Sequence, residues 1–148
     1  LYAPNMSVAV NLFRSLVQQV AGVLGPDYDI EILEMHHKYK IDAPSGTALA
    51  LAEAAARGLD RNLQEVGVYG RHGDTGARTR EEIGVHAVRA GDIVGEHTVM
   101  FGGIGETVQL VHRAQSRDTF AAGVVRAVRF AVQADAGMYD MHDVLGIK

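Results

Sequence analysis

The sequence contains no cysteine among its 148 residues. This absence excludes disulfide frameworks, zinc sites built on thiolates, and cysteine nucleophiles. A chain without cysteine fits a reducing compartment best, so we predict a cytoplasmic location.

An excess of positive charge and a long apolar run are also missing. Lysine and arginine number 14 against 18 aspartate and glutamate residues, which gives a formal net charge of -4 at pH 7. Binding to nucleic acid needs a broad basic face and is therefore disfavoured. No apolar run approaches the roughly 20 residues of a membrane span, and the first residues lack the layout of a signal peptide, so we expect no membrane association.

The length suits one domain with a genuine hydrophobic core, because domains of roughly 100–150 residues are the most common. The chain opens with LYAPNMSVAVNLF and has no initiator methionine. We therefore expect it to be a piece of a longer protein.

The first part of the chain predicts a helix, a strand and a second helix. Asn5 or Ser7 can cap the first helix, whose apolar residues recur at helical spacing until a Gly-Pro pair ends it. The alternation in YDIEILEM predicts a strand from Tyr28 to Met35. The alanine-rich run SGTALALAEAAARGL predicts a helix that ends near Gly58.

The second part predicts three strands and a helix. The segment from Ile83 to Arg113 has a β pattern, with tight turns at Gly91-Asp92 and Gly102-Gly103 that would make consecutive strands neighbours. The last helix, Thr119 to about Asp135, is expected to bury an apolar side made of Phe120, Val124, Val128 and Val132.

This element order predicts an α+β fold with a mixed, largely antiparallel sheet and helices packed on one face. The other face would carry apolar residues such as Val94, Met100 and Val111. Exposed apolar sheet of that extent usually marks an interface, so we predict self-association through the sheet.

Positive charge gathers in one stretch, EMHHKYKIDAPSGTALA, from Glu34 to Ala50. His36, His37, Lys38 and Lys40 stand within a few residues of the predicted start of a helix. Helix starts carry free N–H donors and roughly half a positive charge. The first turn here contains no acidic residue, so the stretch predicts a compact binding site for an anion. The alternative is a solvated basic loop in which Ser45 is only a structural cap.

The two histidines of this stretch cannot both serve the same purpose. Neighbouring side chains in an extended backbone point to opposite faces, so one histidine would face the ligand while the other flanks it. Histidine suits proton transfer near neutral pH. No metal site is predicted, because His86, His97 and His112 have no close pairing in the sequence and His36-His37 lacks the spacing of a zinc motif.

The stretch resembles the signature of the dihydrodipicolinate reductases, E-x-H-H-x-x-K-x-D-x-P-S-G-T-A. Further blocks resemble the same family in order, and together they cover essentially the whole chain: APNMSVAVN, GRHGDTGAR, IGVHAVRAGDIVGEH and VHRAQSRDTFAAGVVRA. Met6, where the family often has phenylalanine, and Ala9, where it usually has glycine, are small departures.

The resemblance implies a reductase of the route to diaminopimelate and lysine that acts on a cyclic dicarboxylate with NADPH or NADH. It implies that His36 is the proton donor, assisted by Lys40. Substrate carboxylates would be held by His37, Lys40, Gly46 and Thr47. The interdomain loop that touches the cofactor would be Ala3, Pro4, Asn5 and Met6. The family's reductases are homotetramers joined through their sheets.

The resemblance also implies a missing part. Family members begin with a dinucleotide-binding Rossmann domain, and the only glycine-rich imitation here is GRHGDTG at residues 70–76. No amphipathic helix is predicted to follow it, as a pyrophosphate-binding turn requires, so we expect a polar loop there and no useful affinity of this chain alone for a nicotinamide cofactor.

We therefore expect residues 1–136 to be the substrate-binding and oligomerisation domain, and residues 137–148 to return to the nucleotide-binding domain. The alternative to a reductase is a non-catalytic module that binds dicarboxylates and self-associates.

Overall fold

A computed structural model describes residues 1–147 of the chain. The helices α1 (Val8–Leu24) and α2 (Gly46–Gly58) and the strand β1 (Asp29–His36) form close to where the sequence predicts them. Ser7 caps α1 by accepting a hydrogen bond from the Val10 N–H. Two short helices, α3 (Leu63–Val66) and α5 (Met141–Leu145), and a short strand, β2 (Gly67–Tyr69), were not predicted. In chain order the elements are α1 (Val8–Leu24), the 3-10 turn η1 (Gly25–Asp27), β1 (Asp29–His36), α2 (Gly46–Gly58), α3 (Leu63–Val66), β2 (Gly67–Tyr69), β3 (Ile83–Arg89), β4 (Gly95–Gly102), β5 (Thr107–Ala114), α4 (Asp118–Gln133) and α5 (Met141–Leu145).

The five strands form one mixed sheet in the order β2-β3-β1-β4-β5. Strand β1 pairs parallel with β3 and antiparallel with β4, so it lies between two strands that are consecutive in the sequence. The predicted hairpin at Gly91-Asp92 is therefore wrong, because β3 and β4 do not pair with each other. The turn at Gly102-Gly103 does join neighbouring antiparallel strands, β4 and β5.

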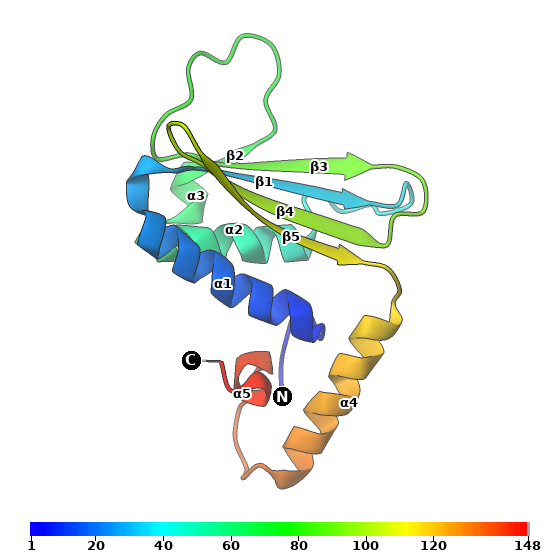
Figure 1. Ribbon diagram of the computed structural model, residues 1–148. Coiled ribbons are helices and arrows are strands. Elements are labelled where there is room, and N and C mark those ends of the chain that lie inside the picture. Colours follow the sequence, from blue (N-terminus) through cyan, green and yellow to red (C-terminus); the bar gives the residue numbers. More distant parts are fainter. Residues whose placement is uncertain (148) are drawn as a thin grey trace.

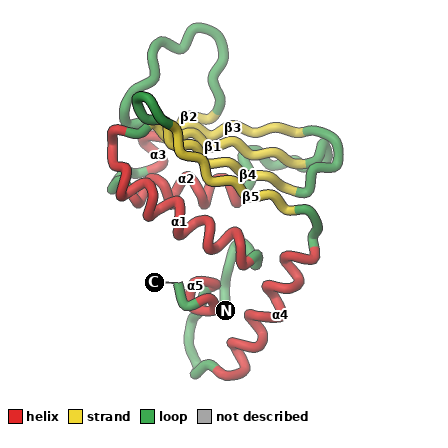
Figure 2. Tube along the Cα trace, viewed as in Figure 1, coloured by secondary structure: helices red, strands yellow, loops and turns green. Residues whose placement is uncertain are grey.

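Helices α1 and α2 cover one face of this sheet, as Figure 1 shows, and the secondary-structure colours of Figure 2 separate the helical layer from the sheet. The core between the layers contains Phe13 and Val17 of α1, Leu51 of α2, and Ile32 and Phe101 of the sheet, all of them buried. The predicted fold class, an α+β fold with a mixed sheet and helices on one face, is confirmed.

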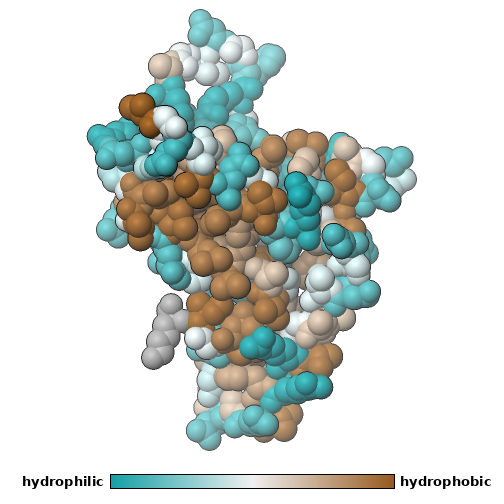
Figure 3. Space-filling view, in the orientation of Figure 1, coloured by the Kyte–Doolittle hydropathy of each residue, from teal (hydrophilic) through white to brown (hydrophobic). Residues whose placement is uncertain are grey.

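Helix α1 with the turn after it, Val8–Asp27, is long and apolar enough to cross a membrane by length and composition alone. The expectation that no run reaches that length is therefore wrong. The helix nevertheless buries Phe13, Val17 and Ala21 against the rest of the fold, as the core helix of a globular domain does. Its residues Leu12 and Val23 are exposed. Figure 3 shows hydrophobic surface on the side of the molecule where α1 lies.

Helix α4 forms where it was predicted but turns its apolar side outward. Val124, Val128 and Val132 are exposed, and the expectation that they are buried is wrong. The buried residues are Gly123 and Ala127. A Cβ atom at Gly123 would collide with the backbone of Met6, so small residues decide which side of this helix can approach the rest of the chain.

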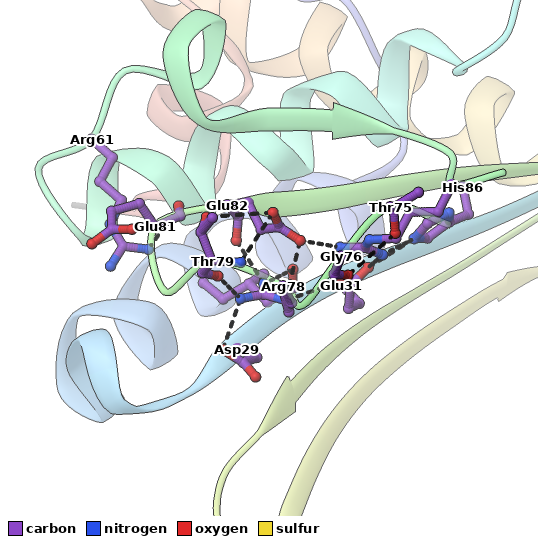
Figure 4. Close-up of polar contacts among 12 residues, drawn as sticks. Asp29, Glu31, Arg61, Thr75, Gly76, Arg78, Thr79, Glu81, Glu82 and His86 are labelled. Carbon is purple, nitrogen blue, oxygen red and sulfur yellow. Dashed lines mark hydrogen bonds and ion pairs between the residues drawn. The ribbon is translucent and has the colours of Figure 1, made fainter. Parts of the chain in front are cut away.

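Residues 70–82 form a loop beside the open face of the sheet. The carboxylate of Glu31 lies on that face. Its Oε1 accepts hydrogen bonds from Arg71 Nη2 at 2.8 Å and from Arg78 Nε at 3.0 Å, and its Oε2 lies 2.7 Å from His86 Nε2. Figure 4 labels Glu31, Arg78 and His86 of this arrangement. Burial raises the pKa of Glu31, but the hydrogen bonds from Arg71, His86 and Arg78 outweigh it and lower the pKa to about 2. The ion pairs of Glu31 with Arg71 and Arg78 therefore attach this loop to the sheet.

The same open face carries exposed apolar side chains. Leu33, Val88 and Val111 are exposed on neighbouring strands, and Met100 is half-buried beside them. The prediction for Met100 and Val111 agrees with this placement. Val94 does not belong to this face, because it precedes β4 and lines the cavity described below.

Candidate functional site

A row of polar side chains crosses the helix-covered face of the sheet near the end of β1. Ile30 and Ile32 set the buried phase of this strand, and Glu34 and His36 continue it on the same face. Glu34 lies opposite His97 of β4, and His36 lies opposite Arg89 of β3. The site therefore begins where the apolar core ends.

Glu34 is a fully buried carboxylate in which both oxygens are engaged. Arg89 donates to both of them, with each distance 2.8 Å, and the Ser45 N–H donates to Oε1 at 2.9 Å. His36 Nδ1 lies 2.6 Å from Oε2. Burial raises the pKa of Glu34, but the hydrogen bonds from Arg89, His36 and Ser45 lower it further than burial raises it. Glu34 is therefore ionised at neutral pH.

His97 adds a neutral ring beside His36. The two rings meet edge to face with their centroids 5.2 Å apart, and His97 Nε2 lies 3.3 Å from Ser45 Oγ. Burial, together with the nearby His36 and His112, lowers the pKa of His97 to about 4. At neutral pH it therefore adds no charge to the site.

A cavity of about 340 Å³ opens beside these groups. It contains most of the site residues that the sequence predicted, together with side chains that it did not. The lining consists of Pro4, Asn5, Val10, Arg14, His36, His37, Lys40, Ser45, Gly46, Thr47, Ala50, Val94 and Phe120. Ala3 and Met6 lie outside the lining and pack instead against the small buried cluster of Ala127, Met141 and Val144.

Helix α2 begins at this cavity. The Ser45 side chain accepts a hydrogen bond from the Ala48 N–H at 3.1 Å, so Ser45 is the structural cap that the alternative interpretation required. The cap leaves the N–H groups of Gly46 and Thr47 without a capping partner among residues 1–147. The first turn of the helix holds no acidic residue, so these donors remain available to an anion.

The N-terminal loop is fastened to this helix start. Asn5 Nδ2 donates to Thr47 Oγ1 at 3.0 Å, and Asn5 Oδ1 accepts the Ser7 N–H at 2.8 Å. Asn11 Nδ2 in turn donates to the Asn5 carbonyl at 2.9 Å. Asn5 is thus fixed in the wall of the cavity by contacts on both sides.

Only three of the four basic residues of the charged stretch line the cavity. His36, His37 and Lys40 line the cavity, whereas Lys38 Nζ lies over the ring of Tyr39 at 5.1 Å from its centroid. Lys40 Nζ donates to both oxygens of Asp42, at 2.7 and 2.9 Å.

Sequence reasoning missed several groups of the site. Arg14 brings a further positive charge from α1, and Phe120 brings an aromatic ring from α4. The alternation of side chains along β1 could have predicted that Glu34 points inward, because Glu34 follows Ile30 and Ile32 with a period of two. Arg14 gave no comparable signal, since a lone charge on an amphipathic helix is usually on its solvated side. Among residues 1–147, no group of three His, Cys, Asp or Glu side chains has the geometry of a metal site.

Comparison with known proteins gives the class to which this fold and site belong. The chain belongs to the dihydrodipicolinate reductase family: it matches the model of "Dihydrodipicolinate reductase, C-terminus" over residues 9–145. It is 58% identical over 146 residues to the 4-hydroxy-tetrahydrodipicolinate reductase of Syntrophus aciditrophicus, covering 99% of this chain and 54% of that protein. It is 54% identical over 147 residues to the enzyme of the same name from Magnetococcus marinus, covering 99% of this chain and 55% of that protein.

A solved structure shares the fold. The dipicolinate-bound dihydrodipicolinate reductase from Paenisporosarcina sp. TG-14 matches with a TM-score of 0.67 at 27% identity, over 95% of this chain and 52% of that one. The chain thus spans about half the length of the relatives that it matches. The family predicted from the motif is confirmed.

Proposed function

We propose that the protein to which this chain belongs is an NAD(P)H-dependent 4-hydroxy-tetrahydrodipicolinate reductase of lysine and diaminopimelate biosynthesis. It would reduce 4-hydroxy-tetrahydrodipicolinate to tetrahydrodipicolinate. Residues 1–136 would form the substrate-binding and oligomerisation domain, and residues 137–148 would lead back to a nucleotide-binding domain. The observation that carries the proposal is the cavity in which His36, His37 and Lys40 meet the uncapped N–H groups at the start of α2. The names of the relatives support it.

The substrate would be a small dicarboxylate. Its carboxylates would be held by His37, Lys40, Gly46 and Thr47, because a cationic cavity beside free helix N–H groups favours anions. Arg14 of α1, which also lines the cavity, would add a further cation. A bound carboxylate would take the place of Asp42 as the partner of Lys40. The relative bound to dipicolinate supports this class of ligand.

His36 would donate the proton of the reduction, assisted by Lys40. It lines the cavity, and no group among residues 1–147 hydrogen-bonds to its Nε2 nitrogen. A nicotinamide cofactor, when bound, supplies the hydride, while the residues of this chain hold the dianion and deliver the proton.

The residues of this chain could contact the nicotinamide end of a cofactor, but they do not provide a site for the whole dinucleotide. Pro4 and Asn5 line the cavity and could contact a nicotinamide ring, with Ala3 and Met6 packed behind them. The glycine-rich segment at 70–76 leads into β3 rather than into a helix, so within residues 1–147 it offers no helix start for a pyrophosphate. We propose that NADPH or NADH is bound mainly by the nucleotide-binding domain of the complete protein.

The proposal includes a homotetramer joined through the open face of the sheet, where Leu33, Val88 and Val111 are exposed. It also includes a cytoplasmic location, as expected for an enzyme of amino-acid biosynthesis.

Steady-state oxidation of NADPH and of NADH by the complete protein tests the proposal, with 4-hydroxy-tetrahydrodipicolinate as the second substrate. Substrate-dependent oxidation with at least one cofactor is expected. Binding of dipicolinate without any turnover would contradict the reductase and favour the non-catalytic module.

A further inference from the structure

A buried ion pair lies directly behind the histidine of the cavity. Glu34 is 0% exposed, and Arg89 approaches it with both terminal nitrogens at 2.8 Å. The Arg89 guanidinium also donates to the carbonyls of Val88 and Asp42, at 2.8 and 2.6 Å. Arg89 is thus held by the backbone on two sides, and it holds Glu34 in one orientation.

This pair is not explained by stability alone. Taking two charges out of water is costly, and a buried ion pair is often no more stable than apolar residues of the same volume. Ile30 and Ile32 occupy the two preceding inward positions of the same strand, so an apolar side chain would extend the core at this point. What Glu34 adds, and an apolar side chain could not, are its hydrogen bond from the Ser45 N–H and its contact with His36, and only the second reaches the proposed proton donor.

The contact with Glu34 determines which ring nitrogen of His36 stays protonated when the ring is neutral. An ionised carboxylate can only accept hydrogen bonds, and Glu34 Oε2 lies 2.6 Å from His36 Nδ1. Nδ1 must therefore carry a proton in both the charged and the neutral ring. The assignment follows from the chemistry of the acceptor and does not depend on observing the hydrogen atom.

The ring is also restrained on its other sides. His97 meets it edge to face, and a Cβ atom at position 95 would lie 3.0 Å from His36 Nε2. Gly95 therefore leaves the space that the ring occupies. The charged and titratable groups around His36 are Glu34 of β1, Arg89 of β3 and His97 of β4. In the lining of the cavity they are joined by Arg14 of α1 and by His37 and Lys40, which follow β1.

We propose that Glu34, oriented by Arg89, is a positioning residue that keeps the proton of His36 on Nδ1 and presents Nε2 as the nitrogen that delivers the proton to the substrate. This inference rests on the proton-donor role of His36 in the proposed function. In the transfer, the Nε2–H bond breaks, its electron pair stays on Nε2, and the proton passes to the substrate that receives hydride from the nicotinamide. The ring becomes neutral and still donates Nδ1–H to Glu34, so the contact is kept throughout.

The amide of glutamine has the shape of the carboxylate but offers only one acceptor oxygen. Arg89 Nη2 and the Ser45 N–H both donate to Oε1, so in Glu34→Gln they would hold the amide oxygen at that position. The NH₂ group would then face His36 Nδ1 and favour the wrong tautomer. We expect kcat of the complete reductase to fall by roughly 10²-fold or more, as when an orienting carboxylate behind a catalytic histidine is replaced by its amide. The Kd for dipicolinate should change by less than about threefold, because the cations of the cavity remain.

A double-mutant cycle separates this role from a structural one. If Glu34 acts through His36, adding Glu34→Gln to His36→Gln should lower kcat no further. A second loss as large as the first would overturn the proposal, as would a normal kcat in Glu34→Gln alone. If His36→Gln itself keeps a normal kcat, it is the proton-donor role within the proposed function that fails.

A measurement on the unmodified protein covers the case in which Glu34→Gln does not fold. Nitrogen chemical shifts of ¹⁵N-labelled histidine in the complete protein should show His36 with Nδ1 protonated and Nε2 unprotonated in its neutral form. A neutral His36 protonated on Nε2 would overturn the proposal whatever the activity of the enzyme.

Discussion

Asn5 and Thr47 join the N-terminal loop to the start of α2 through a hydrogen bond of 3.0 Å from Asn5 Nδ2 to Thr47 Oγ1. The two residues are far apart in the sequence, and the contact sets one wall of the cavity. A Thr47 hydroxyl that accepts from Asn5 still has its own proton to donate to a carboxylate.

Replacement of Thr47 by valine, which has nearly the same shape, tests this wall. Thr47→Val should raise KM for the substrate about tenfold and leave kcat nearly unchanged, because in the proposed role the hydroxyl would hold the carboxylate equally in the ground and transition states. Thr47→Ser keeps the hydroxyl and is the control. Steady-state kinetics of the complete enzyme would contradict this role if kcat fell while KM stayed constant.

Lys40 and Lys38 offer a matched comparison of charge. Both are lysines of one short loop, but only Lys40 lines the cavity, whereas Lys38 lies over Tyr39. Lys40→Ala should weaken dipicolinate binding at least tenfold, measured by calorimetry, and lower kcat as well. Lys38→Ala removes the same charge and should change the Kd by less than about twofold. Equal losses in the two variants would mean that net charge near the loop, and not a contact in the cavity, attracts the ligand.

The stability of the fold should fall on acidification because of His97. Its pKa is lowered to about 4 from an ordinary value of 6.5, so the unfolded chain binds more protons than the folded one between these pH values. Stability is fully present above pH about 6.5 and should be lost toward pH about 4, at up to about 1.4 kcal/mol per pH unit.

Chemical denaturation at a series of pH values checks this slope. His97→Gln should flatten it, whereas His72→Gln, on the exposed loop, controls for the loss of a histidine. A slope that is unchanged in His97→Gln would assign the acid sensitivity to other groups.

Much of this site was predictable from the sequence because its contacts are local. The start of α2, its cap Ser45 and the acid-free first turn follow from a few adjacent residues, and so do the strand and the two histidines before it. The position of β1 between β3 and β4 was not predictable, because strand order depends on tertiary packing. The approach of Arg14 from α1 was hidden for the same reason.

The outward face of α4 shows a related limit. Its periodicity correctly indicated one apolar side with Val124 and Val128, but the packing of the helix is decided by Gly123, where only a residue without Cβ clears the backbone of Met6. Periodicity identifies the apolar side of a helix, but it does not say whether that side packs against the domain to which the helix belongs. The pairing of Glu34 with Arg89 was hidden because it joins strands that are distant in the sequence.

Self-association should depend on the open face of the sheet. Val111→Glu places a charge among the exposed apolar residues of this face, so it should shift the complete protein from the proposed tetramer toward smaller species in light scattering. Val132→Glu makes the same change on α4, where the side chain is also exposed, and should leave the mass unchanged. A tetramer that survives Val111→Glu but dissociates in Val132→Glu would place the interface on α4.

The central claim, that this cavity carries out proton transfer on a bound dicarboxylate, is tested most directly by His36→Gln in the complete enzyme. We predict that kcat falls by roughly 10²–10⁴-fold, the range typical of general acid catalysis, while the Kd for dipicolinate stays within about threefold. A normal kcat with a weakened Kd would make His36 a binding residue and contradict the account.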